Sequence, residues 1–174
     1  MLKIALTGGI GTGKTYISKF FIDFGIPVYY ADEEAKKLYD EPEIMTLIAA
    51  QFGESVFSEQ KLDLHKLAKL LFNNSDNINR INAIIHPILM ERFNEWAELQ
   101  NSQYVMLESA IVFEAGLDHY FDFIIAVDAP FDLRLNRLRE RNPSFSEEDF
   151  RKRINSQMEQ SLKCEKADLV IVNS

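Results

Sequence analysis

The sequence contains a single cysteine, Cys164, among its 174 residues. One cysteine excludes an internal disulfide and is typical of a reducing compartment. No apolar run reaches the ~18 residues that are needed to cross a bilayer. The apolar start Met1–Leu6 is too short for a secretory signal and is followed by no small-residue cleavage site. We therefore predict a cytoplasmic protein that does not associate with a membrane.

Basic residues are also scarce, since 19 Lys and Arg stand against 27 Asp and Glu, a formal net charge of −8. Nucleic-acid backbones select a net basic surface, so nucleic acid is not a predicted partner. A local cluster of positive groups could still bind a small anion. Hydrophobic residues at 47% and charged residues at 26% are typical of globular proteins, and the length fits one domain.

Five short apolar runs without strict alternation predict parallel strands that are covered on both faces. They are Leu2–Leu6, Val28–Tyr30, Tyr104–Leu107, Phe123–Val127 and Leu169–Val172. Helical patterns lie between them, at Lys14–Phe24, Glu33–Tyr39, Ile44–Phe52, Phe131–Arg141 and about Ser146–Cys164. Strands that alternate with helices predict an α/β fold with a five-stranded parallel sheet.

More than seventy residues separate the second and third predicted strands, far more than one crossover needs. Apolar residues recur there at spacings of three and four between Ile78 and Trp96, which predicts an amphipathic helix. Pro87 interrupts this pattern and predicts a kink or a helix start near His86. We therefore expect a helical insert on one side of the sheet.

The segment Gly8–Thr15 matches the phosphate-loop pattern G-x-x-x-x-G-K-[ST] at every fixed position. A predicted strand precedes it and a predicted helix follows, as the motif requires. Its glycines allow several backbone N–H groups to converge on a phosphate, and the helix N-terminus adds partial positive charge. Lys14 would reach the β- and γ-phosphates, and the Thr15 hydroxyl would ligate Mg²⁺.

The guanine-reading and switch motifs of GTPases, N-K-x-D and D-x-x-G, do not occur in this sequence. Asp32 follows the second strand, where the ligands of open parallel sheets bind. Its carboxylate could accept a proton or a hydrogen bond from an attacking substrate hydroxyl. It could equally cap a helix that begins at Glu33.

Two further acids end predicted strands. Glu108 ends the third strand, where it could hold the magnesium shell or be a solvent-facing acid. Asp128 ends the fourth strand, and we expect it to act as a turn or cap residue before the helix at Phe131.

Arginines follow the fourth strand in an otherwise acidic chain. Arg134, Arg137 and Arg141 share one helical face, and Arg151–Arg153 begins a second basic stretch. A surface charge run would explain any one of them. A hinged basic hairpin that closes over ATP would explain the cluster as a whole, because arginines stabilise a transferring phosphoryl group.

Taken in order, these motifs resemble the dephospho-coenzyme A kinase family over nearly the whole chain. The segments that carry the resemblance are Leu6–Thr15, Gly25–Val28 with Ala31–Asp32, Ile85–Pro87, Glu108 with Ile111–Glu114, Arg137–Leu138 with Arg141, Arg153–Ile154 with Gln157, and Ala167–Asp168 with Ile171 and Asn173. Each is short, but their order and spacing together are specific.

The resemblance implies a P-loop NTPase fold, a three-layer α/β/α domain over residues 1–174. It implies a helical coenzyme A-binding insert at about 55–100 and a lid at about 138–152. The implied reaction phosphorylates the ribose 3′-hydroxyl of dephospho-coenzyme A with ATP, giving coenzyme A and ADP. ATP and dephospho-coenzyme A are thus the implied partners, and the oligomeric state would be a monomer or a small homo-oligomer.

The resemblance also implies roles for individual residues. Lys14, Asp32, Arg137 and Arg141 would be catalytic, and Asp32 and His86 would lie on the acceptor side. Thr15 and Glu108 would organise Mg²⁺. The residues that bind the nucleotide would be Gly9, Ile10, Gly11, Thr12, Gly13, Lys14, Thr15 and, near adenine, Asn173.

The sequence departs from the family pattern at three acceptor-side positions. It has Tyr30 where an acid is common, Ala110 where a proline is common, and Leu64 where an arginine is common. The family also usually continues with one more helix after its last strand, and this sequence stops at Ser174. Another P-loop kinase, acting on a nucleoside monophosphate or a small hydroxylated acid, is the nearest alternative. A nucleotide-dependent switch protein is a more distant one.

Overall fold

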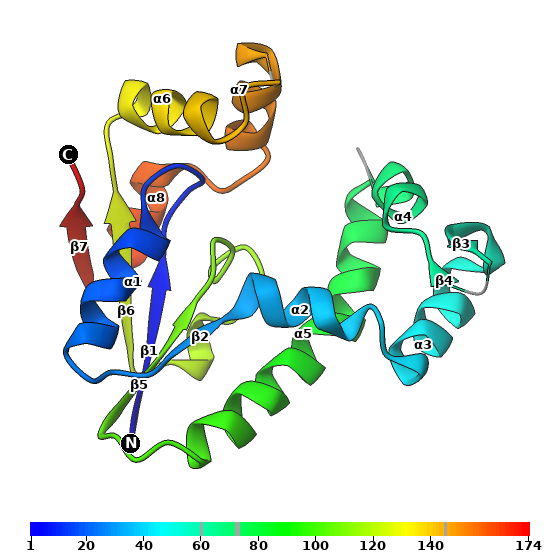
Figure 1. Ribbon diagram of the computed structural model, residues 1–174, viewed down its shortest axis with the longest axis horizontal. Coiled ribbons are helices and arrows are strands. Elements are labelled where there is room, and N and C mark those ends of the chain that lie inside the picture. The colour runs from blue at the N-terminus through cyan, green and yellow to red at the C-terminus, as the bar shows by residue number, and fades with distance from the viewer. Residues whose placement is uncertain (60, 72–73, 145) are drawn as a thin grey trace. The chain divides into compact units, whose positions relative to one another are not determined.

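The computed structural model describes residues 1–59, 61–71, 74–144 and 146–174. The chain forms two compact units (Figure 1). The first is made of Met1–Tyr30 and Leu99–Ser174, and the second of Ala31–Glu98. The chain therefore leaves the first unit after Tyr30 and returns to it at Leu99.

The first unit is built on a five-stranded sheet in which every pairing is parallel. The strand order is β2-β5-β1-β6-β7. The strands are β1 (Leu2–Thr7), β2 (Val28–Tyr30), β5 (Tyr104–Glu108), β6 (Phe123–Asp128) and β7 (Leu169–Val172). All five predicted strands are confirmed, each within one residue of its predicted ends. Because β5 and β6 lie on either side of β1, the order reverses at the carboxyl end of β1, where open α/β sheets bind ligands.

Helices cover the sheet to give a three-layer α/β/α arrangement. Helix α1 (Lys14–Asp23) packs Ile17 and Phe21 against Leu6 and Ile125 on one face of the sheet. Successive strand residues point to opposite faces, so the fully buried Ala126 belongs to the other face. Helix α8 (Gln160–Lys166) contacts β6. The remaining helices of this unit are α6 (Phe131–Arg141), α7 (Glu147–Asn155) and the single 3-10 turn η2 (Asp118–Tyr120).

The single helix predicted at about Ser146–Cys164 is wrong, because the chain forms two helices there. Ser146 caps α7 with a capping box, in which its hydroxyl accepts the Asp149 amide and the Asp149 carboxylate accepts the Ser146 amide. The helix ends at Asn155, and α8 begins only at Gln160. Residues 156–159 leave the helical path and make contacts with distant parts of the chain, such as the bond from the Met158 amide to Glu114 (3.0 Å).

The second unit is mainly helical, as the sequence predicts. It contains α2 (Ala31–Leu38), α3 (Pro42–Phe52), η1 (Glu54–Val56), a short hairpin of β3 (Phe57–Ser58) and β4 (Lys61–Leu62), α4 (Leu64–Leu71) and α5 (Ser75–Glu98). Helices α2, α3 and α4 all pack against α5. Its apolar stripe buries Ile81, Ile85, Leu89 and Phe93.

Helix α5 runs through Pro87 without a break, so the predicted helix start near His86 is wrong. Proline removes one backbone N–H and crowds the carbonyl four residues earlier. Pro87 lies on the exposed side of α5, where water can satisfy the carbonyl group that loses its partner. The helix is therefore continuous.

The predicted insert, residues 55–100, overlaps this second unit for most of its length. Within it residues 60, 72 and 73 lie outside the described residues, and so does residue 145 of the predicted lid. In the described parts of the chain, every helix is too short or too polar to cross a membrane.

Candidate functional site

A loop of residues 8–13 joins the carboxyl end of β1 to the start of α1. Gly13, immediately before α1, has a left-handed backbone with φ of 92°. The Lys14 side chain is buried, and its Nζ donates to the Gly8 carbonyl (2.9 Å). The Thr12 hydroxyl donates to the Gly9 carbonyl (2.9 Å) and closes the turn. The predicted phosphate loop thus curls at a helix N-terminus, the geometry that binds anions.

Thr15 and Glu108 come together beside this loop. The Thr15 hydroxyl donates to the Glu108 Oε2 (3.0 Å). Glu108 pairs with Leu6 at the end of β5 and is only 8% exposed, so the solvent-facing alternative for this acid is wrong. A carboxylate beside a hydroxyl offers the hard oxygen donors that Mg²⁺ prefers.

Arg137 and Asn173 contact the loop from α6 and from the end of β7. The Arg137 Nη1 donates to the Thr12 carbonyl (3.2 Å) and to the Asn173 carbonyl (3.4 Å). The Asn173 Nδ2 donates to the same Thr12 carbonyl (2.9 Å). A Cβ atom on Gly13 would lie 2.2 Å from Asn173 Nδ2, so this close approach requires glycine. The structure therefore brings Arg137 and Asn173, both singled out in the sequence, into contact with the phosphate loop.

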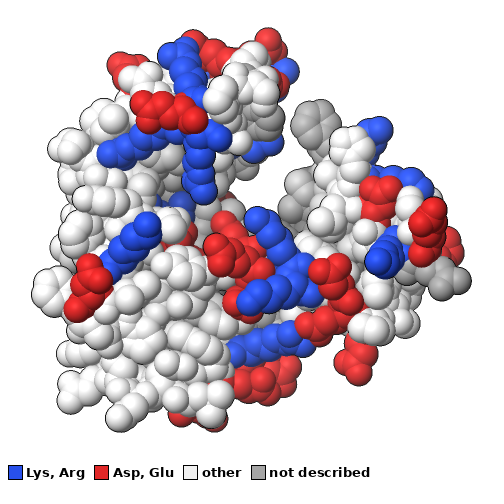
Figure 2. Space-filling model, in the orientation of Figure 1, with Lys and Arg blue, Asp and Glu red and all other residues white. Residues whose placement is uncertain are grey.

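Arg141 stands apart from this group. It is the last residue of α6 and is exposed, and among the described residues no hydrogen bond links it to the loop. Its neighbour Arg139 is paired with Glu147 of α7, which also accepts from Arg151. In the basic stretch of α7, Arg151 and Lys152 thus form exposed ion pairs within the lid region. Figure 2 shows basic and acidic side chains intermixed over α6 and α7.

Arg134 is a loop contact that sequence reasoning left among surface alternatives. It is 5% exposed, and its Nε donates to the Ile10 carbonyl (3.0 Å). Burial lowers the pKa of Arg134, an effect opposed by the nearby Asp128 and Cys164. Asp128 thus lies near enough to Arg134 to favour its charged form. Asp128 ends β6 just before the chain turns into α6, but the predicted capping alternative is wrong, since Pro130 is the N-cap of α6 and no side chain of the described residues caps it.

Two glutamines were not predicted as loop contacts. The Gly9 amide donates to Gln160 Oε1 (2.7 Å), and the Ile10 amide donates to Gln157 Oε1 (2.8 Å). The sequence indicates Gln157 only through the family resemblance, and no motif or spacing around Gln160 indicates that residue. Their partners are about 150 positions away in the chain, so only the fold reveals these contacts.

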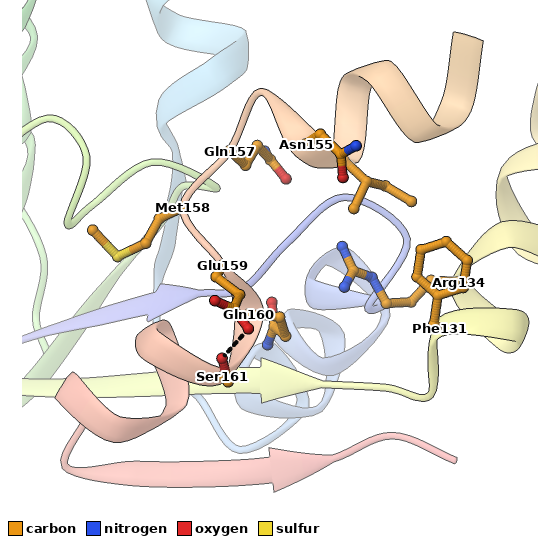
Figure 3. Close-up of a pocket in the computed structure, with 9 residues that line it drawn as sticks. Phe131, Arg134, Asn155, Gln157, Met158, Glu159, Gln160 and Ser161 are labelled. Atoms are coloured by element: carbon orange, nitrogen blue, oxygen red, sulfur yellow. Dashed lines mark hydrogen bonds between the residues drawn. The ribbon is translucent and has the colours of Figure 1, made fainter. Parts of the chain in front are cut away.

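A pocket of about 460 Å³ lies beside these glutamines (Figure 3). Its lining residues come from α6, α7, α8 and the residues between the last two helices. They are Phe131, Arg134, Ile154, Asn155, Gln157, Met158, Glu159, Gln160 and Ser161. The Ser161 hydroxyl donates to Glu159 (2.8 Å) at one side of it. The pocket therefore lies next to the outer side of the phosphate loop.

Asp32 and His86 belong to the second unit. Asp32 is exposed and is the second residue of α2, which begins at Ala31 rather than at Glu33. The N-cap alternative for Asp32 is therefore wrong, and its carboxylate lies in the first turn of the helix. His86 is half-buried in α5, and desolvation lowers its pKa below the ordinary value of 6.5. Burial thus favours its neutral form.

Among the residues that the structure describes, no three His, Cys, Asp or Glu side chains gather as a metal-binding group. The Thr15–Glu108 pair is a smaller donor set. Such a set is typical of Mg²⁺ sites that are completed by water and by substrate phosphates.

Comparison with known proteins identifies the relatives of this chain. Residues 2–174 match the family model described as dephospho-CoA kinase. A dephospho-CoA kinase of Bacteroides fragilis strain YCH46 is 40% identical in an alignment 174 residues long that covers 99% of this chain and 84% of that protein.

Solved structures share the fold. TT1252 from Thermus thermophilus aligns with a TM-score of 0.88 at 27% identity, covering 99% of this chain and 88% of that one. The dephospho-CoA kinase from Campylobacter jejuni aligns with a TM-score of 0.67 at 24% identity over the same shares. The second likeness supports the α/β/α fold alone.

Proposed function

This chain belongs to the dephospho-CoA kinase family, and from that premise we propose how its residues carry out the reaction. The enzyme transfers the γ-phosphate of ATP to the ribose 3′-hydroxyl of dephospho-coenzyme A, giving ADP and coenzyme A. This is the last step of coenzyme A synthesis. The assignment of each residue is our inference from the geometry described above.

The phosphate loop is proposed to bind the triphosphate of ATP. Its backbone amides and the α1 N-terminus supply partial positive charge, and Lys14 supplies a full one. Lys14 is only 9% exposed, so its interaction with a phosphate is weakly screened by water. Arg137 and Asn173 both reach the Thr12 carbonyl; Arg137 would close over the γ-phosphate, and Asn173 would lie near the adenine.

Thr15 and Glu108 are proposed to hold Mg²⁺, and their contact is the observation that carries the proposal. When bound, the ion neutralises charge that develops on the phosphates. The buried Glu108 carboxylate orients the Thr15 hydroxyl through their 3.0 Å bond. This pair adjoins the loop at the carboxyl ends of β1 and β5, where a phosphate-transfer enzyme needs it.

Asp32 is proposed to be the base for the acceptor hydroxyl. Its carboxylate follows the carboxyl end of β2 and makes no side-chain hydrogen bond or ion pair with the described residues. A positioned carboxylate that accepts the hydroxyl proton contributes about 10²–10⁴ in rate. His86 is proposed to contact the acceptor, and Arg141 to meet the γ-phosphate when the lid of residues 138–152 closes. Closure would exclude water and prevent simple hydrolysis of ATP.

The activity test measures ADP release from ATP and Mg²⁺ with and without dephospho-coenzyme A, and identifies the product by mass. The expected result is acceptor-dependent ADP matched by a product one phosphate heavier. Competition with nucleoside monophosphates and shikimate-like acids then tests the alternative acceptors. ADP release that ignores dephospho-coenzyme A would reject the proposed substrate.

The role of Asp32 is tested by Asp32→Asn. We expect kcat to fall at least about 100-fold while the KM for ATP changes little, because only proton acceptance is lost. Asp40→Asn is a matched control, since Asp40 is an exposed aspartate of the same unit. Turnover close to wild type in Asp32→Asn would remove Asp32 from the catalytic set. A cytoplasmic location and a monomeric or small homo-oligomeric state stay predictions.

A further inference from the structure

Two sets of backbone amides in the phosphate loop differ in their partners, apart from the Thr12 amide, which donates to the Gly9 carbonyl (3.3 Å). The amides of Gly9 and Ile10 donate to the side-chain carbonyls of Gln160 and Gln157, at 2.7 and 2.8 Å. The amides of Gly11 and Gly13 donate to no acceptor among the described residues. The first set is engaged by the protein itself, and the second set is available to a phosphate.

Gln160 is held at both ends of its amide group. While its Oε1 accepts the Gly9 amide, its Nε2 donates to the Val127 carbonyl on β6 (3.1 Å). The side chain therefore bridges the loop and the neighbouring strand. This double contact fixes the position of Gly9 relative to β6.

Ile10 is held through both of its backbone polar groups. Gln157 accepts its amide, and the buried Arg134 donates to its carbonyl (3.0 Å). In Figure 3 the side chains of Arg134 and Gln160 point toward the loop. A Cβ atom on Gly9 would lie 2.5 Å from Arg134 Nη2 and 2.9 Å from Gln160 Oε1. The second loop glycine thus permits the close approach of the residues that hold the loop.

We propose that Gln157 and Gln160 are positioning residues for ATP binding. By fixing the Gly9–Ile10 half of the loop, they keep the amides of Gly11 and Gly13 oriented to bind a phosphate. Donors that are oriented before the ligand arrives cost no reorganisation when it binds. This inference rests on the proposed role of residues 8–15 as the phosphate-binding loop.

The position of Gln157 adds a link to the lid. It lies two residues after the end of α7, in the 156–159 stretch that joins α7 to α8. Any movement of α7 therefore pulls on the Ile10 amide through this side chain. Gln160 lies at the start of α8, which contacts β6, and anchors the other side of the same stretch.

The test replaces each glutamine by methionine, which keeps an unbranched side chain of similar length but removes the strong acceptor. Gln103→Met is the matched control, since Gln103 is exposed and far from the loop in the first unit. Loss of one such bond is worth about a threefold to tenfold change. We expect each of Gln157→Met and Gln160→Met to raise the Kd and KM for ATP by about that factor. The KM for dephospho-coenzyme A should stay within about twofold of wild type, because this set of bonds does not reach the acceptor.

A second readout observes the bonds directly. Amide hydrogen exchange at Ile10 should accelerate in Gln157→Met, and exchange at Gly9 should accelerate in Gln160→Met. A merely structural role would lower the melting temperature and leave the ATP Kd of the folded protein unchanged. That result, or unchanged exchange at both amides, would overturn the inference.

Gln157→Met is the cleaner variant, because Gln160 also contacts Val127. Calorimetric binding of ATP needs no acceptor, so it decides the role of the glutamines even if wild-type protein failed to phosphorylate dephospho-coenzyme A. That failure would count against the proposed function alone.

Discussion

A single loop position shows how closely packed the nucleotide side of this enzyme is. Gly9 does not need a left-handed backbone, since its φ is not among the positive ones. Its lack of a side chain is required by Arg134 and Gln160, which would lie within 3 Å of a Cβ atom there. The chemistry of the loop therefore depends on sterics outside it as well as on its own amides.

We predict that Gly9→Ala displaces Arg134 and breaks its bond to the Ile10 carbonyl. Overpacking at a rigid site costs about 1–3 kcal/mol of unfolding free energy. The KM for ATP should rise with it, because the loop shifts. Gly25→Ala is the control. A Cβ atom at Gly25 meets nothing within 4 Å, but the new alanine must adopt the left-handed φ of 78°. Gly25→Ala should lower stability by about 1–2 kcal/mol and leave the KM for ATP unchanged. Equal KM values for ATP in both variants would contradict this explanation of Gly9.

At the scale of elements, the sequence predicted what depends on local pattern. The five strands and α6 follow from short apolar runs and from helical spacing, and they lie where expected. The break between α7 and α8 did not follow from the sequence, because residues 156–159 contain neither glycine nor proline. Their conformation depends on partners such as Glu114 and Ile10, which only the folded chain brings near.

The site could be predicted to a similar extent. The loop residues and Thr15 follow from the motif, Glu108 from its place at a strand end and Arg137 from helical spacing. The structure does bring them together. The contacts of Arg134 and of the two glutamines were beyond the sequence, because helix periodicity says which residues share a face but not what that face meets.

Helix α8 is joined to the segment that follows β5 by an ion pair between the buried Lys163 and the more exposed Glu114. Lys163 is fully buried, and its Nζ contacts the Ala110 carbonyl (2.5 Å) and the Glu114 carboxylate (2.6 Å). The Glu114 carboxylate also accepts the Met158 amide. One carboxylate thus holds both the middle of α8 and the stretch before that helix.

We predict that Glu114→Gln destabilises the first unit by about 3–5 kcal/mol, because it leaves a buried ammonium without its counter-charge. Urea denaturation measures this loss. Glu148→Gln is the matched control, since Glu148 pairs with Lys152 on the exposed face of α7 and should cost only about 0.3–0.5 kcal/mol. A loss in Glu114→Gln no larger than that of the control would show that water reaches Lys163.

At the scale of the whole molecule, an enzyme with a net charge of −8 must bind two polyanionic substrates. The first unit meets this need by gathering Lys14, Arg134 and Arg137 at its phosphate loop. The order of the strands, which places that loop at the centre of the sheet, was not predictable from the sequence. Alternating strands and helices with right-handed crossovers are compatible with several orders.

The division of the chain into two units predicts two separate patterns of ligand protection. The phosphate loop and its supporting residues all belong to the first unit, whereas Asp32 and His86 belong to the second. A ligand that binds only the folded form of a segment raises the free energy of opening it by RT ln(1 + [L]/Kd), which is about 2.7 kcal/mol at 100 times Kd. We therefore expect a non-hydrolysable ATP analogue to slow hydrogen exchange about 100-fold in residues 8–15 and to leave residues 31–98 largely unchanged. Dephospho-coenzyme A alone should protect residues 31–98 instead.

Hydrogen exchange read by mass spectrometry, with each ligand alone and with coenzyme A as product, tests both expected patterns of protection. Protection of residues 31–98 by the ATP analogue alone would contradict this division, because the nucleotide would then bind to the second unit as well.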